Sequence, residues 1–479
     1  MGSLSNATTA NSNTAVGESA MQASTTGSDS VAIGKNALLL STTGTNNVAV
    51  GVTAGDAITT GGNNTIVGHN AASEQTTAVG VTALGKSAAQ NNQANYTVAM
   101  GYRALESNTS GGANTAVGLE AAVTNTTGSN LTAIGKHALL SNTTGTENTA
   151  IGGNCLDANT TASNNTAVGY NAMGVNTTGA QNVAMGTYAL DANTTANYNV
   201  AVGYAALTSN TTGTNNTALG GIALNGNTTG NFNTAIGYTA LYSSTTATKN
   251  TAVGYQAGYN NTTGFENTFI GWQAGSSNTT SRGCTFVGHY AGNASTGAFN
   301  NFIGEQAGYL VTSGTKNTIL GRYSGNNGGL DIRTSSNNIV LSDGDGNPRF
   351  VINSSASAGF NCVPPTTTTF HQVFYSGTGA VSSLNNLHIT NNAVYNNGWK
   401  RISGGKAVLN QIDYNNSRFQ WYTAADNTAG TAISWNSQVS IDADGLKFGS
   451  DTAAANALDD YEEGTWTPSW QASTTTVTV

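Results

Sequence analysis

Short runs of small, aliphatic and β-branched residues recur along the first two-thirds of the chain, and each run ends at a glycine. The commonest form is Asn-Thr-Ala-Val-Gly, as at residues 165–169. The residue directly before this glycine is Val, Ile, Leu or Met in every copy. Alternating runs of this length between turn residues predict β-strands, whereas a glycine in every copy disfavours helices. The pattern therefore predicts an all-β chain.

The glycine that closes each run returns every 17 residues. The series is disturbed at Gly80 and Gly101, and the step before Gly304 is 16 residues. A self-similar period of this length predicts a stacked repeat array rather than a single globular core. The 19 repeat glycines read from the sequence are Gly17, Gly34, Gly51, Gly68, Gly80, Gly101, Gly118, Gly135, Gly152, Gly169, Gly186, Gly203, Gly220, Gly237, Gly254, Gly271, Gly288, Gly304 and Gly321.

Other positions of the repeat are nearly as constant as the glycine. Asn usually stands four residues before it, Ala three residues after it, and a turn such as Asn125–Gly128 follows seven to ten residues after it. Such a coil has room for two short strands and two turns, and 19 coils stacked at the strand spacing of ~4.8 Å make a rod of roughly 90 Å. We expect φ > 0 at the glycine and a ladder of bonded Asn amides along the rod.

Two positions of the repeat exchange size. The residue two before the glycine is normally Ala but is large at Ile66, Phe269, Phe286, Phe302 and Ile319. In those copies the residue four after the preceding glycine, normally Leu, is Gly: Gly55, Gly258, Gly275, Gly292 and Gly308. Interiors tolerate swaps that conserve volume and resist overfilling. We therefore predict that the two positions touch across the coil.

Composition limits the partners. Only 8% of residues are charged and the net charge is −8, so the chain has no basic patch and we expect no nucleic-acid partner. No apolar run approaches 18 residues, and we expect no membrane insertion. Residues 1–12 lack the basic-then-apolar signal pattern and are expected to be a disordered leader. A thin Ala-rich coil buries little surface alone, which favours association of several copies.

The repeat signal fades after Gly321, with a degenerate last copy at 338–342, and all four prolines lie beyond it. We expect a β-roll or solenoid array over 13–342, a connector over 343–369 and a small antiparallel β domain over 370–457. In that domain the runs Lys406–Tyr414 and Arg418–Thr423 are separated by Asn-Asn-Ser, a hairpin signal. Residues 458–479 are expected to begin a further C-terminal β domain.

The repeat resembles the head repeat of YadA-like trimeric autotransporter adhesins, whose core reads Asn-Ser-Val-Ala-Ile-Gly. The segments Asp29–Ala37 and Asn182–Gly186 carry the likeness. The resemblance covers about 13–342. It implies a left-handed parallel β-roll in which three chains pack side by side, and a role in adhesion.

A second resemblance joins Asn-Thr-Ala-Val-Gly-Tyr-x-Ala-Leu repeats to the stretch Leu458–Trp466, a combination similar to tail fibres of tailed bacteriophages. It implies a structural, non-catalytic virion fibre that is extracellular and attaches to the host. The implied partners are two further copies of the chain, other virion tail proteins, and a host-surface polysaccharide or protein. A signal peptide and a membrane barrel would instead mark a bacterial surface adhesin.

Two other functions, ice binding and polysaccharide cleavage, each require a feature that the sequence does not show. An ice-binding solenoid requires a regular Thr-x-Thr face, but in the strand run an aliphatic residue replaces the second Thr. A polysaccharide depolymerase needs paired carboxylates in a groove, and no such pair is evident in the sequence. We therefore expect no enzyme activity.

Candidate metal and cofactor sites are weak, and we expect neither. His69 and His289 share the position after the glycine but are 13 coils apart, so an ion site would need three chains around an axis. Asp343–Asn347 resembles the start of a calcium loop but lacks the downstream Glu, which favours a plain turn. The acidic stretch 459–463 is read as a solvated connector. The many Asn-x-Thr triplets are read as turn and ladder residues rather than glycosylation sites.

The three cysteines form no disulfide framework. Cys155 stands at the recurrent Ala position and Cys284 at the recurrent Asn position, and Cys362 lies in the connector. We interpret all three as structural thiols that behave as small hydrophobic residues.

The position directly after the glycine is variable and rich in aromatic residues. A row of rings along a rod suits stacking on sugars of a surface polysaccharide, and it suits packing at a chain interface equally. This row is the candidate contact stripe: Tyr102, Tyr170, Tyr204, Tyr238, Tyr255 and Trp272.

Overall fold

A computed structural model describes residues 3–356, 358–360, 370–373, 378–383, 386–391, 393–395, 399–401, 405–413, 418–427, 436–442 and 445–448. Its chain forms two compact units, one of residues 1–337 with 342–347 and one of residues 338–341 with 348–479. Within the described ranges, no helix has the length and apolar character of a membrane span.

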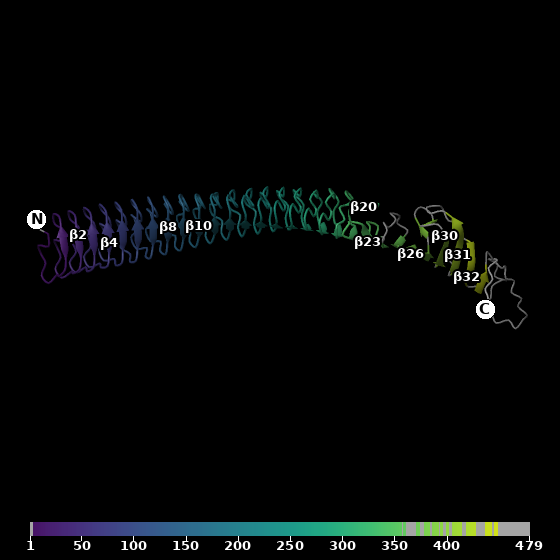
Figure 1. Ribbon diagram of the computed structural model, residues 1–479, viewed down its shortest axis with the longest axis horizontal. Helices are drawn as coiled ribbons and strands as arrows, with labels where there is room; N and C mark the ends of the chain where they lie inside the picture. The colour runs from purple at the N-terminus through teal and green to yellow at the C-terminus, as the bar shows by residue number, and fades with distance from the viewer. Residues whose placement is uncertain are drawn as a thin grey trace, which may run out of the picture. The chain divides into compact units, whose positions relative to one another are not determined.

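The first unit contains 19 three-residue strands, one from each repeat (Figure 1). They are β1 (Thr14–Val16), β2 (Val31–Ile33), β3 (Val48–Val50), β4 (Thr65–Val67), β5 (Thr82–Leu84), β6 (Val98–Met100), β7 (Thr115–Val117), β8 (Thr132–Ile134), β9 (Thr149–Ile151), β10 (Thr166–Val168), β11 (Val183–Met185), β12 (Val200–Val202), β13 (Thr217–Leu219), β14 (Thr234–Ile236), β15 (Thr251–Val253), β16 (Thr268–Ile270), β17 (Thr285–Val287), β18 (Asn301–Ile303) and β19 (Thr318–Leu320).

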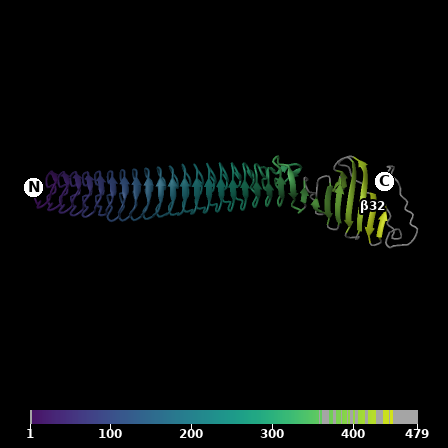
Figure 2. The same ribbon diagram turned by 60° about the horizontal axis from the view of Figure 1, so that its bottom comes forward.

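Each strand pairs in parallel with the strand of the next repeat, in the same register. In β10 and β11, for example, Thr166 faces Val183 and Val168 faces Met185. Figure 2 shows the strands succeeding one another along the array. The prediction of an all-β solenoid of about 19 parallel coils is confirmed.

The backbone of the coil explains why it holds one strand and not the two that we expected. The repeat glycine has a positive φ, as predicted, for example 134° at Gly169. A Cβ there would also lie 2.6 Å from the carbonyl oxygen of Gly186 in the next coil. Left-handed residues then follow two, four and twelve positions later, as at Asn171, Met173 and Gln181. These repeated reversals make the rest of each coil a series of turns.

One repeat glycine was assigned wrongly from the sequence. The strand Thr82–Leu84 ends at Gly85, whose φ of 135° is that of the repeat glycine. Gly80, with φ 71°, instead occupies the left-handed position twelve after Gly68. The ring of Tyr96 lies over it, since a Cβ on Gly80 would be 3.0 Å from Tyr96 Cδ1. Besides the 16-residue step before Gly304, a second one therefore falls between Gly85 and Gly101.

The interior of each coil is narrow and fully occupied. In the coil around Gly169, Ala167, Ala172 and Met173 have no exposed surface. The same three positions are buried in most other coils, where they are Ala, Ala and Leu. Each coil thus contributes a few small or medium apolar side chains to the interior of the array.

The predicted amide ladder is present at the position four before the glycine. Asn165 Oδ1 accepts a hydrogen bond from the backbone N of Asn182 at 3.0 Å. Asn182 Nδ2 donates to the carbonyl of Ala196 in the next coil at 2.9 Å. Each buried Asn therefore connects the coils on both sides of it.

A second ladder, which the sequence analysis missed, occupies the position seven after the glycine. Asn159 Nδ2 donates to Asn142 Oδ1 at 2.8 Å, and Asn176 Nδ2 donates to Asn159 Oδ1 at 3.1 Å. All three side chains are completely buried. A buried amide of this kind is tolerable where its hydrogen-bonding groups are satisfied, as they are from Asn108 to Asn210. Beyond Ser244, the buried amide oxygens of Asn261 and Asn278 have no hydrogen-bond partner among the described residues.

The predicted contact across the coil is confirmed. A Cβ on Gly55 would lie 3.0 Å from Ile66 Cδ1, so the isoleucine fills the space that a leucine occupies in other coils. In the later copies the phenyl rings also reach the glycine of their own coil. Phe286, for example, would lie 2.6 Å from a Cβ on Gly292. Phe269, Phe286 and Phe302 stack in succession along the core.

The two ends of the array depart from the predicted boundaries. Residues 3–12, expected to be a disordered leader, form turns bonded to the first coil, with Leu4 N donating to Ala20 O at 3.2 Å. After β19 a small hairpin joins β20 (Asn326–Asn327) to β21 (Leu330–Asp331). The fully buried Tyr323 donates its hydroxyl to Leu330 O at 2.7 Å.

The second unit is built mainly from antiparallel strand pairs, although β24 and β25 pair in parallel. Its predicted hairpin is confirmed, because β30 pairs with β31 in antiparallel orientation. A further hairpin, β23 with β24, lies where a connector was expected. Residues 361–369 of the expected connector, which include Cys362, and the expected domain 458–479 lie outside the described residues. Strand bounds here are β22 (Ile339–Ser342), β23 (Pro348–Ile352), β24 (Ala358–Phe360), β25 (Phe370–Val373), β26 (Thr378–Ser383), β27 (Asn386–Asn391), β28 (Ala393–Tyr395), β29 (Trp399–Arg401), β30 (Gly405–Asp413), β31 (Arg418–Asn427), β32 (Asn436–Asp442) and β33 (Gly445–Phe448).

Candidate functional site

One surface column of the array is apolar along its whole length. The central residue of each strand points inward, as Ala133 does in β8, and the residue before the glycine points outward, as Ile134 does with 38% of its surface exposed. We call the residues directly before the repeat glycines the aliphatic column. Its exposed fraction reaches 56% at Val16 and 51% at Leu320. A single chain therefore leaves a continuous aliphatic row in contact with solvent.

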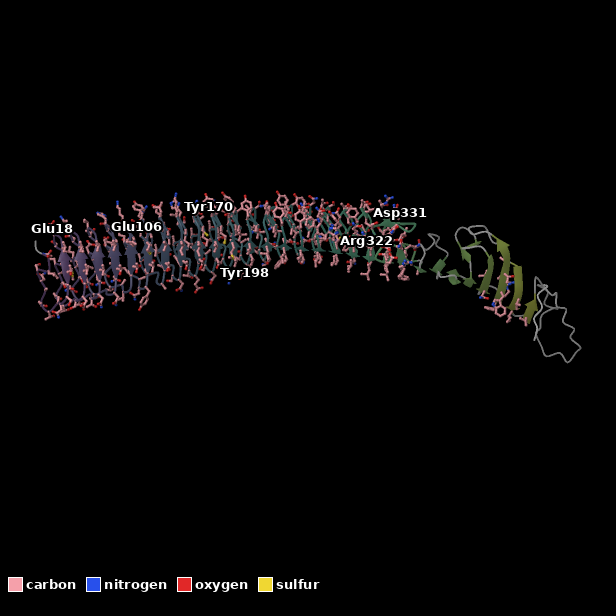
Figure 3. The ribbon with its side chains drawn as sticks, viewed as in Figure 1. Glu18, Glu106, Tyr170, Tyr198, Arg322 and Asp331 are labelled. Carbon is pink, nitrogen blue, oxygen red and sulfur yellow. The ribbon has the colours of Figure 1, made fainter. Side chains whose placement is uncertain are left out.

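The candidate contact stripe lies directly after the glycine, at the next corner of the coil. Tyr170 marks this edge in Figure 3, opposite Tyr198. Five of its six residues are largely exposed, from 45% at Tyr102 to 59% at Tyr204, and Tyr255 is half-buried. The stripe is not continuous, because only Tyr238, Tyr255 and Trp272 stand in consecutive coils.

These three rings form a stack. The ring centroids of Tyr238 and Tyr255 are 6.0 Å apart with planes at 12°, and those of Tyr255 and Trp272 are 4.1 Å apart at 22°. Nearly parallel rings this close overlap face to face, so the stack presents ring edges to solvent. The Tyr238 end rests on Gly221, whose Cβ would lie 3.4 Å from Tyr238 Cδ2.

A second group of aromatic residues lies beside the stack, and the sequence analysis missed it. Tyr242 and Tyr259, five after their glycines, stack at 5.1 Å and 8°. Tyr290, two after its glycine, has its ring 4.2 Å from that of His289 and 5.7 Å from that of Tyr309. Comparing the positions two and five after the glycine, and not only the position next to it, would have shown them.

Charge varies along the same edge. Toward the N-terminus it carries ion pairs between coils, such as Lys35 with Glu18 at 3.1 Å and Arg103 with Glu120 at 2.8 Å. A further ion pair lies beyond the ring stack, between Arg322 and Glu305 at 3.7 Å. Around the ring stack the positions between aromatic residues are neutral, as in the bond from Gln273 Nε2 to Gln256 Oε1 at 2.5 Å. The surface near the stack therefore suits an uncharged ligand.

Two carboxylates in the middle of the array are partly buried. A Cβ on Gly174 would lie 2.9 Å from Asp191 Oδ1 and 3.7 Å from Asp157 Oδ1, so both side chains border the space above that glycine. Burial raises the pKa of both carboxyls, and the charge of Asp157 raises the pKa of Asp191 further.

The described ranges contain no group of three or more His, Cys, Asp or Glu side chains placed to hold a metal ion. The Asp343 carboxylate accepts hydrogen bonds from the backbone N atoms of Asp345 and Asn347, at 3.1 and 2.8 Å, as in a plain turn. His289 lies against Tyr290, and His69 is in a distant coil. The acidic stretch 459–463 lies outside the described residues.

The two described cysteines are free and buried, in keeping with a structural role. Cys155 has no exposed surface, and burial raises its pKa to about 12. Cys284 replaces an Asn of the first ladder: its thiol donates to Gly297 O at 3.3 Å, and its backbone N donates to Asn267 Oδ1.

Comparison with known proteins adds no relative. No protein-family model, no curated protein and no solved structure matches the chain.

Proposed function

We propose that this protein is a structural, non-catalytic fibre of a tailed phage, which extends from the virion and attaches it to the host surface. The observation that supports this most is the pairing of two neighbouring columns along one stacked array. The aliphatic column is constant in character through 19 coils, whereas the position just beyond the glycine varies from charged to aromatic. A column whose residues keep one character suits a contact that every coil makes with another copy of the chain. A column whose residues vary suits recognition of a specific ligand.

The proposed fibre contains three copies of the chain. Exposed apolar patches larger than a few hundred Å² are rare on monomers and mark interaction sites. Every copy of the chain carries the same aliphatic column along its array. Copies that lie side by side with their coils aligned would therefore cover one another's aliphatic columns. This leaves the contact stripe at the outer corner of the coil, available to a host polysaccharide or protein.

The test of the proposed function measures the mass of the purified protein in solution and its adsorption to bacterial cells. Light scattering of the purified chain is expected to give three times the chain mass of 48.5 kDa. Replacing Ile134, Ile151 and Val168 of the aliphatic column by Lys is expected to reduce this mass to that of one chain. The matched control places the same three charges at exposed Thr127, Thr144 and Thr161 and is expected to remain trimeric.

Adsorption separates the fibre from its alternatives. The trimer is expected to bind a subset of bacterial strains, and antibodies against it are expected to label virion tails. A monomeric mass excludes the trimer. Labelling of a bacterial outer surface instead of virions supports the bacterial adhesin.

One observation favours ice binding as a second candidate function. The position nine after the glycine is an exposed Thr in most coils, for example Thr178, Thr212 and Thr229, and so forms a regular hydroxyl row. The adjacent Thr177 donates its hydroxyl to Thr194 O at 3.1 Å and stiffens this row. Thermal hysteresis at micromolar protein would favour ice binding, and its absence would exclude it.

A further inference from the structure

Trp272 ends the ring stack and has one ring face without an aromatic partner. Within the described residues its only ring contact is with Tyr255, at 4.1 Å. This separation is shorter than the coil spacing of ~4.8 Å, so the rings of Tyr255 and Trp272 are drawn together. Of the Trp272 residue, 47% remains exposed.

The next coil does not continue the ring stack. The residue at the position of the stack is His289, and its ring lies against Tyr290 at 4.2 Å and 59°. Tyr290 in turn contacts Tyr309. Within the described residues no ring contact joins His289 to Trp272, so the stack ends at Trp272 with one face that no aromatic ring covers.

We propose that this face of Trp272 binds one pyranose ring of a neutral polysaccharide lying along the array. An aromatic face offers a broad apolar contact to the C–H face of a sugar. Within the stack the Trp272 end offers such a face, since the Tyr238 end rests on Gly221. The surrounding Gln273 amide, His289 imidazole and Tyr290 hydroxyl provide hydrogen-bonding groups for sugar hydroxyls. The assignment rests on the proposed host-binding function and narrows it to one ligand class and one residue.

The neutral surroundings favour this ligand over an acidic polymer. In the coils from Gly237 to Ile303 the charged side chains are Lys249, Glu266 and Arg282. All three stand eleven or twelve positions after their glycines, away from the stack, and Lys249 is paired with Glu266 at 3.2 Å. Within the described coils from Gly237 to Ile303, no Lys or Arg stands directly after a repeat glycine, so no cationic row is present there to attract carboxylates or sulfates.

The experiment measures binding of the full chain to a neutral galactomannan, a neutral β-glucan and acidic alginate by affinity electrophoresis. Wild type is expected to bind at least one neutral polymer and not alginate. Trp272→Ala is expected to weaken this binding by at least about tenfold, as removal of an anchoring Trp does. Trp272→Phe keeps a ring face and is expected to retain most of the binding.

The control removes an equally exposed ring elsewhere. Phe232 is 59% exposed and stands twelve after its glycine, so Phe232→Ala is expected to leave binding unchanged. Circular dichroism melting checks that all variants fold. Binding of alginate alone, of none of the polymers, or unchanged binding by Trp272→Ala would overturn the proposal.

Adsorption to bacterial cells distinguishes this failure from failure of the proposed function. If wild type and Trp272→Ala adsorb equally well, the Trp272 site is wrong and the fibre function stands. Adsorption that purified host protein blocks, but neutral polysaccharide does not, assigns the surface to a protein receptor and also overturns the sugar site. If wild type does not adsorb to any strain, the proposed function itself fails.

Discussion

The ring of Phe269 occupies the space that a side chain on Gly258 would need: a Cβ on Gly258 would lie 2.6 Å from Phe269 Cδ2. In the preceding coil the equivalent positions are Ala252 and Leu241, both fully buried. The two arrangements fill the same volume with the large residue on opposite sides of the coil.

This relationship predicts strong coupling between the two positions. Phe269→Ala is expected to destabilise the array by about 3–5 kcal/mol because it leaves a cavity. Gly258→Leu alone overfills the coil and is also expected to destabilise it. The double variant restores the Ala and Leu of other coils and is expected to recover much of the loss, since Leu241 already adopts φ 50° at the equivalent position.

Denaturant unfolding of the four proteins measures the coupling as a double-mutant cycle. Additive effects of the two substitutions would show that the positions do not share one volume.

The second asparagine ladder predicts a local effect of removing one amide. Asn159→Ala leaves Asn142 Oδ1 without its donor and deprives Asn176 Nδ2 of an acceptor. Unsatisfied buried groups cost about 1–3 kcal/mol each, so we expect faster hydrogen exchange in the coils on both sides. Thr161→Ala, at an exposed position of the same coil, serves as the control. Equal exchange in both variants would contradict a stabilising role for the ladder.

The partly buried carboxylates predict a pH dependence of stability. Because burial raises the pKa of Asp191, the folded state holds its proton more tightly than the unfolded state does. This contribution to stability is complete below the ordinary carboxyl pKa and is lost as the pH rises through the raised value. Asp191→Asn is therefore expected to raise the melting temperature at pH 7 and to have little effect at pH 3.

The exposed Asp29 provides the control, since Asp29→Asn is expected to change the melting temperature little at either pH. A lower melting temperature for Asp191→Asn at pH 7 would show instead that the carboxylate is stabilised in the folded chain.

The buried thiols predict slow chemical modification. Because burial raises the pKa of Cys155 to about 12, little thiolate is present at pH 8, and its sulfur has no access to solvent. Iodoacetamide is expected to leave Cys155 and Cys284 unmodified in the native chain and to alkylate both after denaturation. Peptide mass spectrometry locates the adducts. Rapid native labelling of either cysteine would contradict the packed interior.

The sequence predicted the stacking because each strand run repeats as a unit, but a glycine alone did not identify its position in the coil. Gly80 and Gly85 both have positive φ, at two different turns, and the strand before Gly85 distinguishes them. The contact of Gly55 with Ile66 was predictable because the large residue at one position of the repeat is accompanied by glycine at the other, which keeps the total side-chain volume nearly constant. The orientation of rings such as Trp272 was not predictable, because it depends on which nearby side chain each ring contacts.

Because every coil bonds to its immediate neighbours, the length of the array is set by the number of its coils. Duplication or loss of one 17-residue unit would change its reach by one strand spacing, ~4.8 Å, without altering the packing elsewhere. Length can thus vary in small equal increments through changes in copy number, separately from changes in the residues that meet a ligand.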